Sequence, residues 1–205
     1  MKDVLWKILC SAAAFTIVLA VPARAQNTDN DGCTNATLQG DYGFTIHGES
    51  LGVLVPQTSG PPKLAPFANA LLVDGVAMTH FDGIRNLTQV DVVMRNGTSA
   101  ATPATPVSNG FRTGETGSYS LNTDCTGTFR INFPDGTEID VVFVLAKQGH
   151  EIHTVVTRQH VPQLPPTILP AGVSCDATTN GCDLGVQIRS DGVKYAAWWE
   201  SALFD

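Results

Sequence analysis

Apolar and polar residues alternate along much of the chain after residue 33, with the period of two that is typical of β-strands. The two most regular stretches run from Leu87 to Arg95 and from Thr137 to Lys147. A strand with this period has a single buried side, so one set of alternate residues should form the core. The expected core residues are Val90, Val92, Met94, Ile139, Val141, Phe143 and Leu145, and the residues expected on the opposite, solvent-facing side are Gln89, Asp91, Arg95, Glu138 and Asp140.

Six more stretches have the character of strands, at 37–50, 67–81, 114–121, 127–133, 151–158 and 186–189. Turn sequences such as Asp-Gly at 82–83 and Pro-Asp-Gly at 134–136 separate several of them, and no stretch predicts a long amphipathic helix. Closing consecutive hairpins into a ring removes exposed strand edges. We therefore predict an all-β fold, an antiparallel up-and-down β-barrel of about eight strands, with a two-sheet β-sandwich as the alternative.

Residues 33–205 are expected to form a single domain. Segments rich in Pro, Gly, Ala or Thr predict loop insertions near 51–66, 98–110 and 161–185. Residues 26–32 are polar and are expected to be a flexible N-terminus. The pattern does not decide between strand and helix at the C-terminal end, over 190–205.

Residues 1–25 have the features of a cleavable export signal. Lys2 and Lys7 lie near the start, residues 8–21 are almost entirely apolar, and Ala23-Arg24-Ala25 matches a small-x-small cleavage site. The apolar run is short for a bilayer span, although an uncleaved membrane anchor is the alternative. We expect cleavage after Ala25, no membrane span in the mature chain, and a secreted or periplasmic protein.

Removing the signal also removes Cys10 and leaves Cys33, Cys125, Cys175 and Cys182. An even number of cysteines in an oxidising compartment predicts disulfides, and four cysteines allow three pairings. The short spacing favours Cys175–Cys182, which leaves Cys33–Cys125. A zinc site is the alternative, but the chain has no Cys-x-x-Cys pair to support it.

The formal net charge of the chain is -7, and lysines and arginines do not cluster along it. An acidic surface of this kind argues against nucleic acids and against anionic membranes as partners. The composition therefore excludes nucleic-acid binding from the favoured functions.

Two short motifs suggest chemistry that their surroundings do not support. Residues 48–52 match the Gly-x-Ser-x-Gly nucleophile elbow around Ser50, but the residues that follow cannot begin the helix that this motif needs. Residues 27–32 match the first half of a calcium-binding loop, but its twelfth position is Leu38 and not a glutamate. We expect a chance match at Ser50 and a solvated acidic tail at 27–32.

Histidines gather at His150, His153 and His160, which raises the possibility of a metal site. Residues three apart on a strand face opposite sides, so His150 and His153 should diverge. Glu151 and His153 share a face and would form an acid–base pair inside a barrel or, in the favoured interpretation, a pair on its surface. The candidate ligand or polar site is Glu151, His153, Trp198 and Trp199, and no catalytic residue, metal ligand or cofactor is assigned.

Residues 33–44, which read Cys-Thr-Asn-Ala-Thr-Leu-Gln-Gly-Asp-Tyr-Gly-Phe, resemble the opening of a group of uncharacterised secreted bacterial proteins. Further landmarks of that group are similar to residues 79–83, 117–128, 143–145 and 151–152, so the likeness spans about 33–158. The group in turn resembles allene oxide cyclase-like or lipocalin-like (calycin-type) barrels. This resemblance implies a β-barrel and carries no catalytic residue with it.

These features favour a secreted binding module that holds a small apolar or amphipathic ligand or presents its loops to a surface partner. A structural or surface-interaction protein and an isomerase- or cyclase-like barrel enzyme are the alternatives, with catalysis the less favoured. A hollow interior would favour ligand binding, and buried carboxylates or histidines converging in it would favour an enzyme. The sequence indicates no oligomeric state.

Overall fold

A computed structural model describes residues 32–103 and 105–195, and all structural statements concern these residues. They form β-strands joined by turns, loops and single turns of 3-10 helix. The strands are β1 (Gly40–Val55), β2 (Lys63–Phe81), β3 (Asn86–Arg95), β4 (Thr98–Ser99), β5 (Val107–Ser108), β6 (Phe111–Leu121), β7 (Thr126–Asn132), β8 (Glu138–Ala146), β9 (Glu151–Val161) and β10 (Cys182–Lys194), and the 3-10 helices are η1 (Asn35–Leu38), η2 (Lys147–Gly149) and η3 (Pro166–Ile168).

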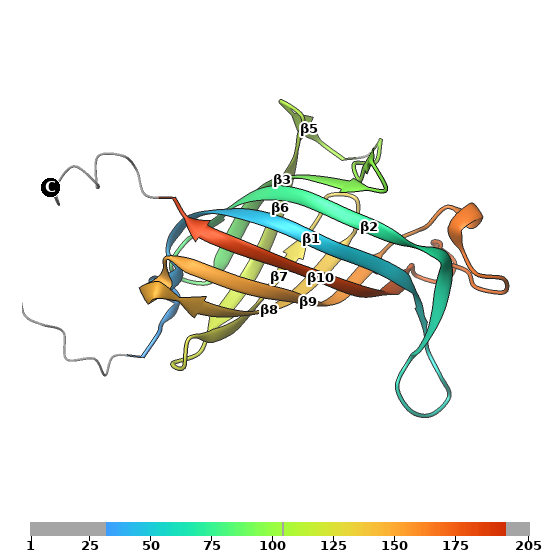
Figure 1. The fold of residues 1–205 in the computed structure, drawn as a ribbon, viewed down its shortest axis with the longest axis horizontal. Helices are drawn as coiled ribbons and strands as arrows, with labels where there is room; N and C mark the ends of the chain where they lie inside the picture. The colour runs from blue at the N-terminus through green and yellow to red at the C-terminus, as the bar shows by residue number, and fades with distance from the viewer. Residues whose placement is uncertain (1–31, 104, 196–205) are drawn as a thin grey trace, which may run out of the picture. The chain divides into compact units, whose positions relative to one another are not determined.

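Eight strands are hydrogen-bonded into a closed antiparallel ring (Figure 1). The order around the ring is β3-β2-β1-β10-β9-β8-β7-β6, and pairing of β3 with β6 closes it. The two-residue strands β4 and β5 belong to the excursion between β3 and β6 and add one short ladder to each. The predicted all-β, antiparallel up-and-down barrel of about eight strands is therefore confirmed.

One end of the barrel, here called the closed end, is filled by the segment before β1. Leu38 at the end of η1 is fully buried in the core. The Asn35 side chain accepts a hydrogen bond from the Leu121 backbone N–H at 2.8 Å, and the Tyr42 hydroxyl donates to the Gly149 carbonyl. The first bond ties η1 to the end of β6, and the second ties β1 to η2. The other end, where β1, β3, β7 and β9 finish, is called the open end.

Aromatic rings fill the closed half of the interior. Phe81 packs edge-on against Tyr42 and Tyr119, with ring centroids 5.5 and 5.1 Å apart, and Phe129 packs against Phe143 at 5.7 Å. Edge-to-face contacts of this kind add to the stability that burial provides. As predicted, β8 turns its apolar face inward, and Val141 and Phe143 are buried.

The predicted orientation of β3 is wrong. Its register with β2 places Leu87 opposite the buried Phe81 and Gln89 opposite the buried Thr79. Directly opposite residues of an antiparallel pair lie on the same face of the sheet, so β3 turns its odd-numbered residues inward. Buried Gln89 and Asp91 replace the expected core residues Val90, Val92 and Met94, which lie on the outer face.

Three predicted loops and the last strand differ from the structure. The first loop covers only 56–62, because β1 continues through a bulge between Ser50 and Gly52. A side chain at Gly52 would collide with the Ala65 carbonyl oxygen, so the close approach of β1 and β2 requires a glycine. The third loop covers 162–181, and residues 98–110 include β4 and β5. The last strand is longer than the predicted 186–189, and it includes residues 190–194, whose conformation the sequence pattern did not decide.

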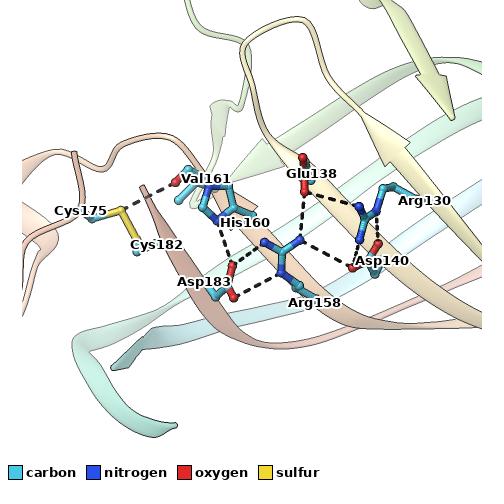
Figure 2. A network of polar contacts seen from close by, with 9 residues as sticks. All are labelled: Arg130, Glu138, Asp140, Arg158, His160, Val161, Cys175, Cys182 and Asp183. Carbon is cyan, nitrogen blue, oxygen red and sulfur yellow. Dashed lines mark hydrogen bonds and ion pairs between the residues drawn. A yellow bond between two sulfur atoms is a disulfide. The ribbon is translucent and has the colours of Figure 1, made fainter. Parts of the chain in front are cut away.

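The outer face of β7 to β10 carries a network of ion pairs (Figure 2). Arg130 pairs with Asp140 at 2.6 Å, and Arg158 bridges Glu138 and Asp183 at 3.0 and 3.2 Å. Glu138 and Asp140 therefore face outward, as predicted, but they bind arginines on neighbouring strands.

Both predicted disulfides are present, Cys33–Cys125 and Cys175–Cys182. The first ties the segment before η1 to the turn between β6 and β7, and the second ties the loop at 162–181 to the start of β10. Disulfides of this kind are compatible with an extracellular or periplasmic protein. Within the described ranges, the chain has no helix with the length and apolarity needed to cross a membrane.

Candidate functional site

A cavity lies inside the barrel, between the aromatic core and the open end. Its volume is about 80 Å³, counted as the space open to the centre of a water molecule. This is room for several waters, and it is well below the roughly 300–1,000 Å³ of sites for drug-sized ligands. Most of its wall is apolar, including Phe44, Phe129, Ile131, Ile139, Val141 and Ile188. The interior is therefore hollow, with space for a small molecule.

A polar strip, the β3–β6 seam, runs along one side of the interior. Its members are Gln89, Asp91, Arg112 and Glu115, all buried. Thr79 on β2 donates its hydroxyl to Gln89 Oε1 at 2.8 Å, and Gln89 Nε2 donates to Glu115 Oε2 at 2.9 Å. Buried polar groups need such partners, because an unmade hydrogen bond away from water costs free energy.

Arg112 and Asp91 form a two-pronged ion pair in this seam. Arg112 Nε and one terminal nitrogen donate to the two oxygens of Asp91, each at 2.6 Å. The guanidinium carbon also lies 4.8 Å from the centre of the Phe133 ring. Both Asp91 oxygens are held by the guanidinium, so this carboxylate is not a free base.

Glu115 lies behind the cavity wall and is almost completely buried. Desolvation, and then the negative charge of Asp91, raise its pKa to about 8. The acid is therefore largely protonated at neutral pH. Its Oε2 accepts the hydrogen bond from Gln89, whereas its Oε1 has no hydrogen-bond partner among the described residues and lies 3.8 Å from Arg112 Nε.

Arg95 ends β3 at the open end and lines the cavity. The residue is partly exposed, but its Nε is buried. Among residues 32–103 and 105–195, this Nε has no hydrogen-bond partner and the guanidinium has no carboxylate within ion-pair distance. Burial, and then the charge of Arg112, lower the pKa of its guanidinium. Arginine nevertheless stays protonated in proteins, so a cation faces the cavity.

Gln159 lines the cavity from β9 and is 2% exposed. Its Oε1 has no hydrogen-bond partner among the described residues. Arg95 and Gln159 thus both present unused polar atoms at the cavity, and these are the groups with which a ligand would interact.

Glu151 and His153 of the sequence-predicted polar site do not line this cavity. Glu151 and His153 are on the outer face of β9, as in the favoured surface interpretation. There Glu151 accepts from Lys147 at 2.6 Å and His153 pairs with Asp191 at 2.7 Å. Trp198 and Trp199 lie outside the described residues.

The remaining motifs gain no support as sites. Ser50 lies within β1, with no helix after it, and its buried hydroxyl has no partner in the described part of the chain. Residues 27–31 of the calcium-like motif lie outside the described residues. Within the described ranges, no three His, Cys, Asp or Glu side chains gather closely enough to hold a metal ion.

Sequence reasoning missed the β3–β6 seam because it placed Gln89, Asp91 and Arg95 in solvent. The turn at residues 82–83 carried a usable signal. Pairing Phe81 with Leu87 across that turn puts both on one face, and alternation then carries Gln89 and Asp91 inside.

Comparisons with known proteins leave the family open. The chain matches no protein-family model, and a search of curated proteins finds no significantly similar relative. The resemblance to secreted calycin-type barrels therefore stays a prediction.

Proposed function

We propose that this protein is an exported β-barrel that binds a small amphipathic molecule in its interior. The observation that carries the proposal is the cavity, which combines apolar walls with unused polar atoms at its rim. Ligand sites commonly have this composition, since apolar surface supplies affinity and a few polar groups set orientation. Its volume restricts the ligand to a small molecule or a short chain.

The state of the two buried carboxyl groups favours binding over catalysis. A general base must offer a free lone pair to the substrate. Asp91 gives both oxygens to Arg112, and Glu115 is not among the residues that line the cavity. An enzyme of the isomerase or cyclase type would need one of these groups released into the cavity.

Hexanol is a suitable first probe, because it is small, uncharged and amphipathic. Saturation-transfer NMR detects such weak binding, and we expect a signal from hexanol with the native protein. Val141→Phe places a larger side chain in the cavity wall and should abolish the signal. The matched control is Val142→Phe, because Val142 is the next residue of β8 and faces solvent.

The proposal fails if hexanol gives no signal with the native protein, or if Val141→Phe and Val142→Phe bind it equally. Circular dichroism will show whether each variant is folded. Ile131→Phe, at another position in the cavity wall, gives a second test should Val141→Phe not fold.

A further inference from the structure

We infer that the ligand carries a carboxylate and that Arg95 binds it, with Gln159 as a second polar contact. This inference rests on the proposed function, since it names the chemical class of molecule that the same cavity accepts. It also assigns a direction to the ligand: the carboxylate lies near the open end, where β3 finishes, and the apolar chain points toward the aromatic core.

The first argument is the unpaired charge of Arg95. Arg95 is partly exposed, but its Nε is buried, and a cation partly withdrawn from water is unfavourable unless an anion and hydrogen bonds compensate it. Two carboxylates, Asp135 and Asp91, act on Arg95 electrostatically, and both have other partners. Asp91 binds Arg112, and Asp135 accepts the Thr137 backbone N–H at 2.9 Å. The buried Nε of Arg95 therefore keeps its N–H for a group that enters the cavity.

Arg112 provides an internal comparison. Both arginines line the cavity, but Arg112 has its carboxylate built into the fold, on the neighbouring strand. Two N–H groups of a guanidinium match the two oxygens of a carboxylate in the same plane. A ligand carboxylate at Arg95 would reproduce the arrangement that Asp91 already makes with Arg112.

The charge balance of the polar wall points the same way. Arg112 and Asp91 cancel each other, and Glu115 is largely neutral because burial raises its pKa. The charge of Arg95 remains. A wall with one uncompensated positive charge in a site of low dielectric favours an anion over a neutral or cationic molecule.

Gln159 adds a second polar contact from another strand. It lies on β9, whereas Arg95 lies on β3, and both border the same cavity. Its buried atom without a partner among the described residues is Oε1, which accepts hydrogen bonds, so Gln159 suits a hydroxyl of the ligand beside the carboxylate and not the carboxylate itself. Apolar side chains make up most of the rest of the wall, which suits an alkyl chain and does not suit a free inorganic anion.

The test compares hexanoate, hexanol and acetate, which separate the charge from the chain. We expect the native protein to bind hexanoate at least tenfold more tightly than hexanol, and acetate more weakly than hexanoate. Arg95→Met should weaken hexanoate binding at least tenfold and so remove the preference for hexanoate over hexanol. It should fold, because the substitution removes a partly buried charge that has no carboxylate partner among the described residues. Arg189→Met is the matched control, since Arg189 is exposed and should not affect either ligand.

Each outcome has a defined meaning. Equal binding of hexanoate and hexanol to the native protein overturns the carboxylate inference and leaves the proposed function standing. A hexanoate preference that survives Arg95→Met also overturns the role of Arg95. If acetate binds as tightly as hexanoate, the cavity recognises the anion alone and the inferred alkyl carboxylate is wrong. If none of the three binds, the proposed function fails together with the inference.

Discussion

Arg112 holds both carboxylate oxygens of Asp91 inside the barrel, at 2.6 Å each, and so joins β6 to β3 where the ring closes. Both side chains are buried. Ion pairs in such surroundings contribute little net stability compared with apolar residues, but losing one partner leaves an uncompensated charge. The pair therefore makes closure of the ring depend on two particular residues.

Asp91→Ala should destabilise the protein by about 3–5 kcal/mol, because the Arg112 charge would stay buried without its partner. Urea denaturation measures this loss. The double variant Asp91→Leu with Arg112→Met should recover most of it, since apolar residues of similar size replace the whole pair. A double variant as unstable as Asp91→Ala would show that the seam contributes through some other interaction.

Phe143→Ala should cost about 3–5 kcal/mol, the usual range for a buried phenylalanine. Phe143 faces the core and packs against Phe129. Asp140→Ala, on the outer face, should cost at most about 1 kcal/mol, because exposed ion pairs contribute little. Chemical denaturation of both variants compares them. If Asp140→Ala proves the more damaging, the assignment of the two faces of β8 is wrong.

The alternation along β8 was sufficient to predict its orientation, because its apolar face is continuous. The same reasoning failed on β3, where both faces have regular patterns and the polar one is buried. Gln89 is tolerated inside because it forms hydrogen bonds with Thr79 and Glu115, and Asp91 is tolerated because it binds Arg112. Arg95 is tolerated because the cavity lies beside it. Those partners come from other strands, so the local pattern of β3 contains no trace of them.

The disulfides were predictable from cysteine spacing and from the expectation of an oxidising compartment, whereas the candidate site was not. Arg95 has no motif around it, and its importance comes from a buried Nε that has no hydrogen-bond partner in the described part of the chain. Burial of this kind depends on how the eight strands close into a ring, and no short stretch of the sequence predicts that closure. The length of β1 was missed for a similar reason, since the bulge after Ser50 depends on its close contact with β2.

Ionisation of Glu115 should make stability fall as the pH rises. Its pKa is about 8 in the folded protein and near 4.5 when exposed. Below about pH 4.5 the acid is neutral in both states and the folded state bears no penalty. Between these values the unfolded chain releases the proton first, so folding loses free energy, in total a few kcal/mol. Glu115→Gln should flatten this part of the stability curve, measured by urea denaturation from pH 4 to 9. An unchanged curve would refute the assignment.

The two disulfides should contribute unequally. Cys33–Cys125 spans 92 residues and Cys175–Cys182 spans 7, so the chain-entropy model gives about 4–5 and about 2 kcal/mol, respectively. Cys33→Ser with Cys125→Ser should therefore lower the unfolding free energy more than Cys175→Ser with Cys182→Ser. It should also loosen η1, which hydrogen exchange at Leu38 can detect. Equal losses would mean that η1 is held by its hydrogen bonds alone.

The central claim is that a small amphipathic molecule binds inside the barrel, and intermolecular NOEs to methyl groups test it most directly. With methyl-labelled protein and hexanoate, the account predicts NOEs from the alkyl chain to Ile131 and Val141, which line the cavity. Val142 and Val144 lie on the outer face of β8 and should give none. NOEs confined to these outer methyls, with none to Ile131 or Val141, would contradict the claim.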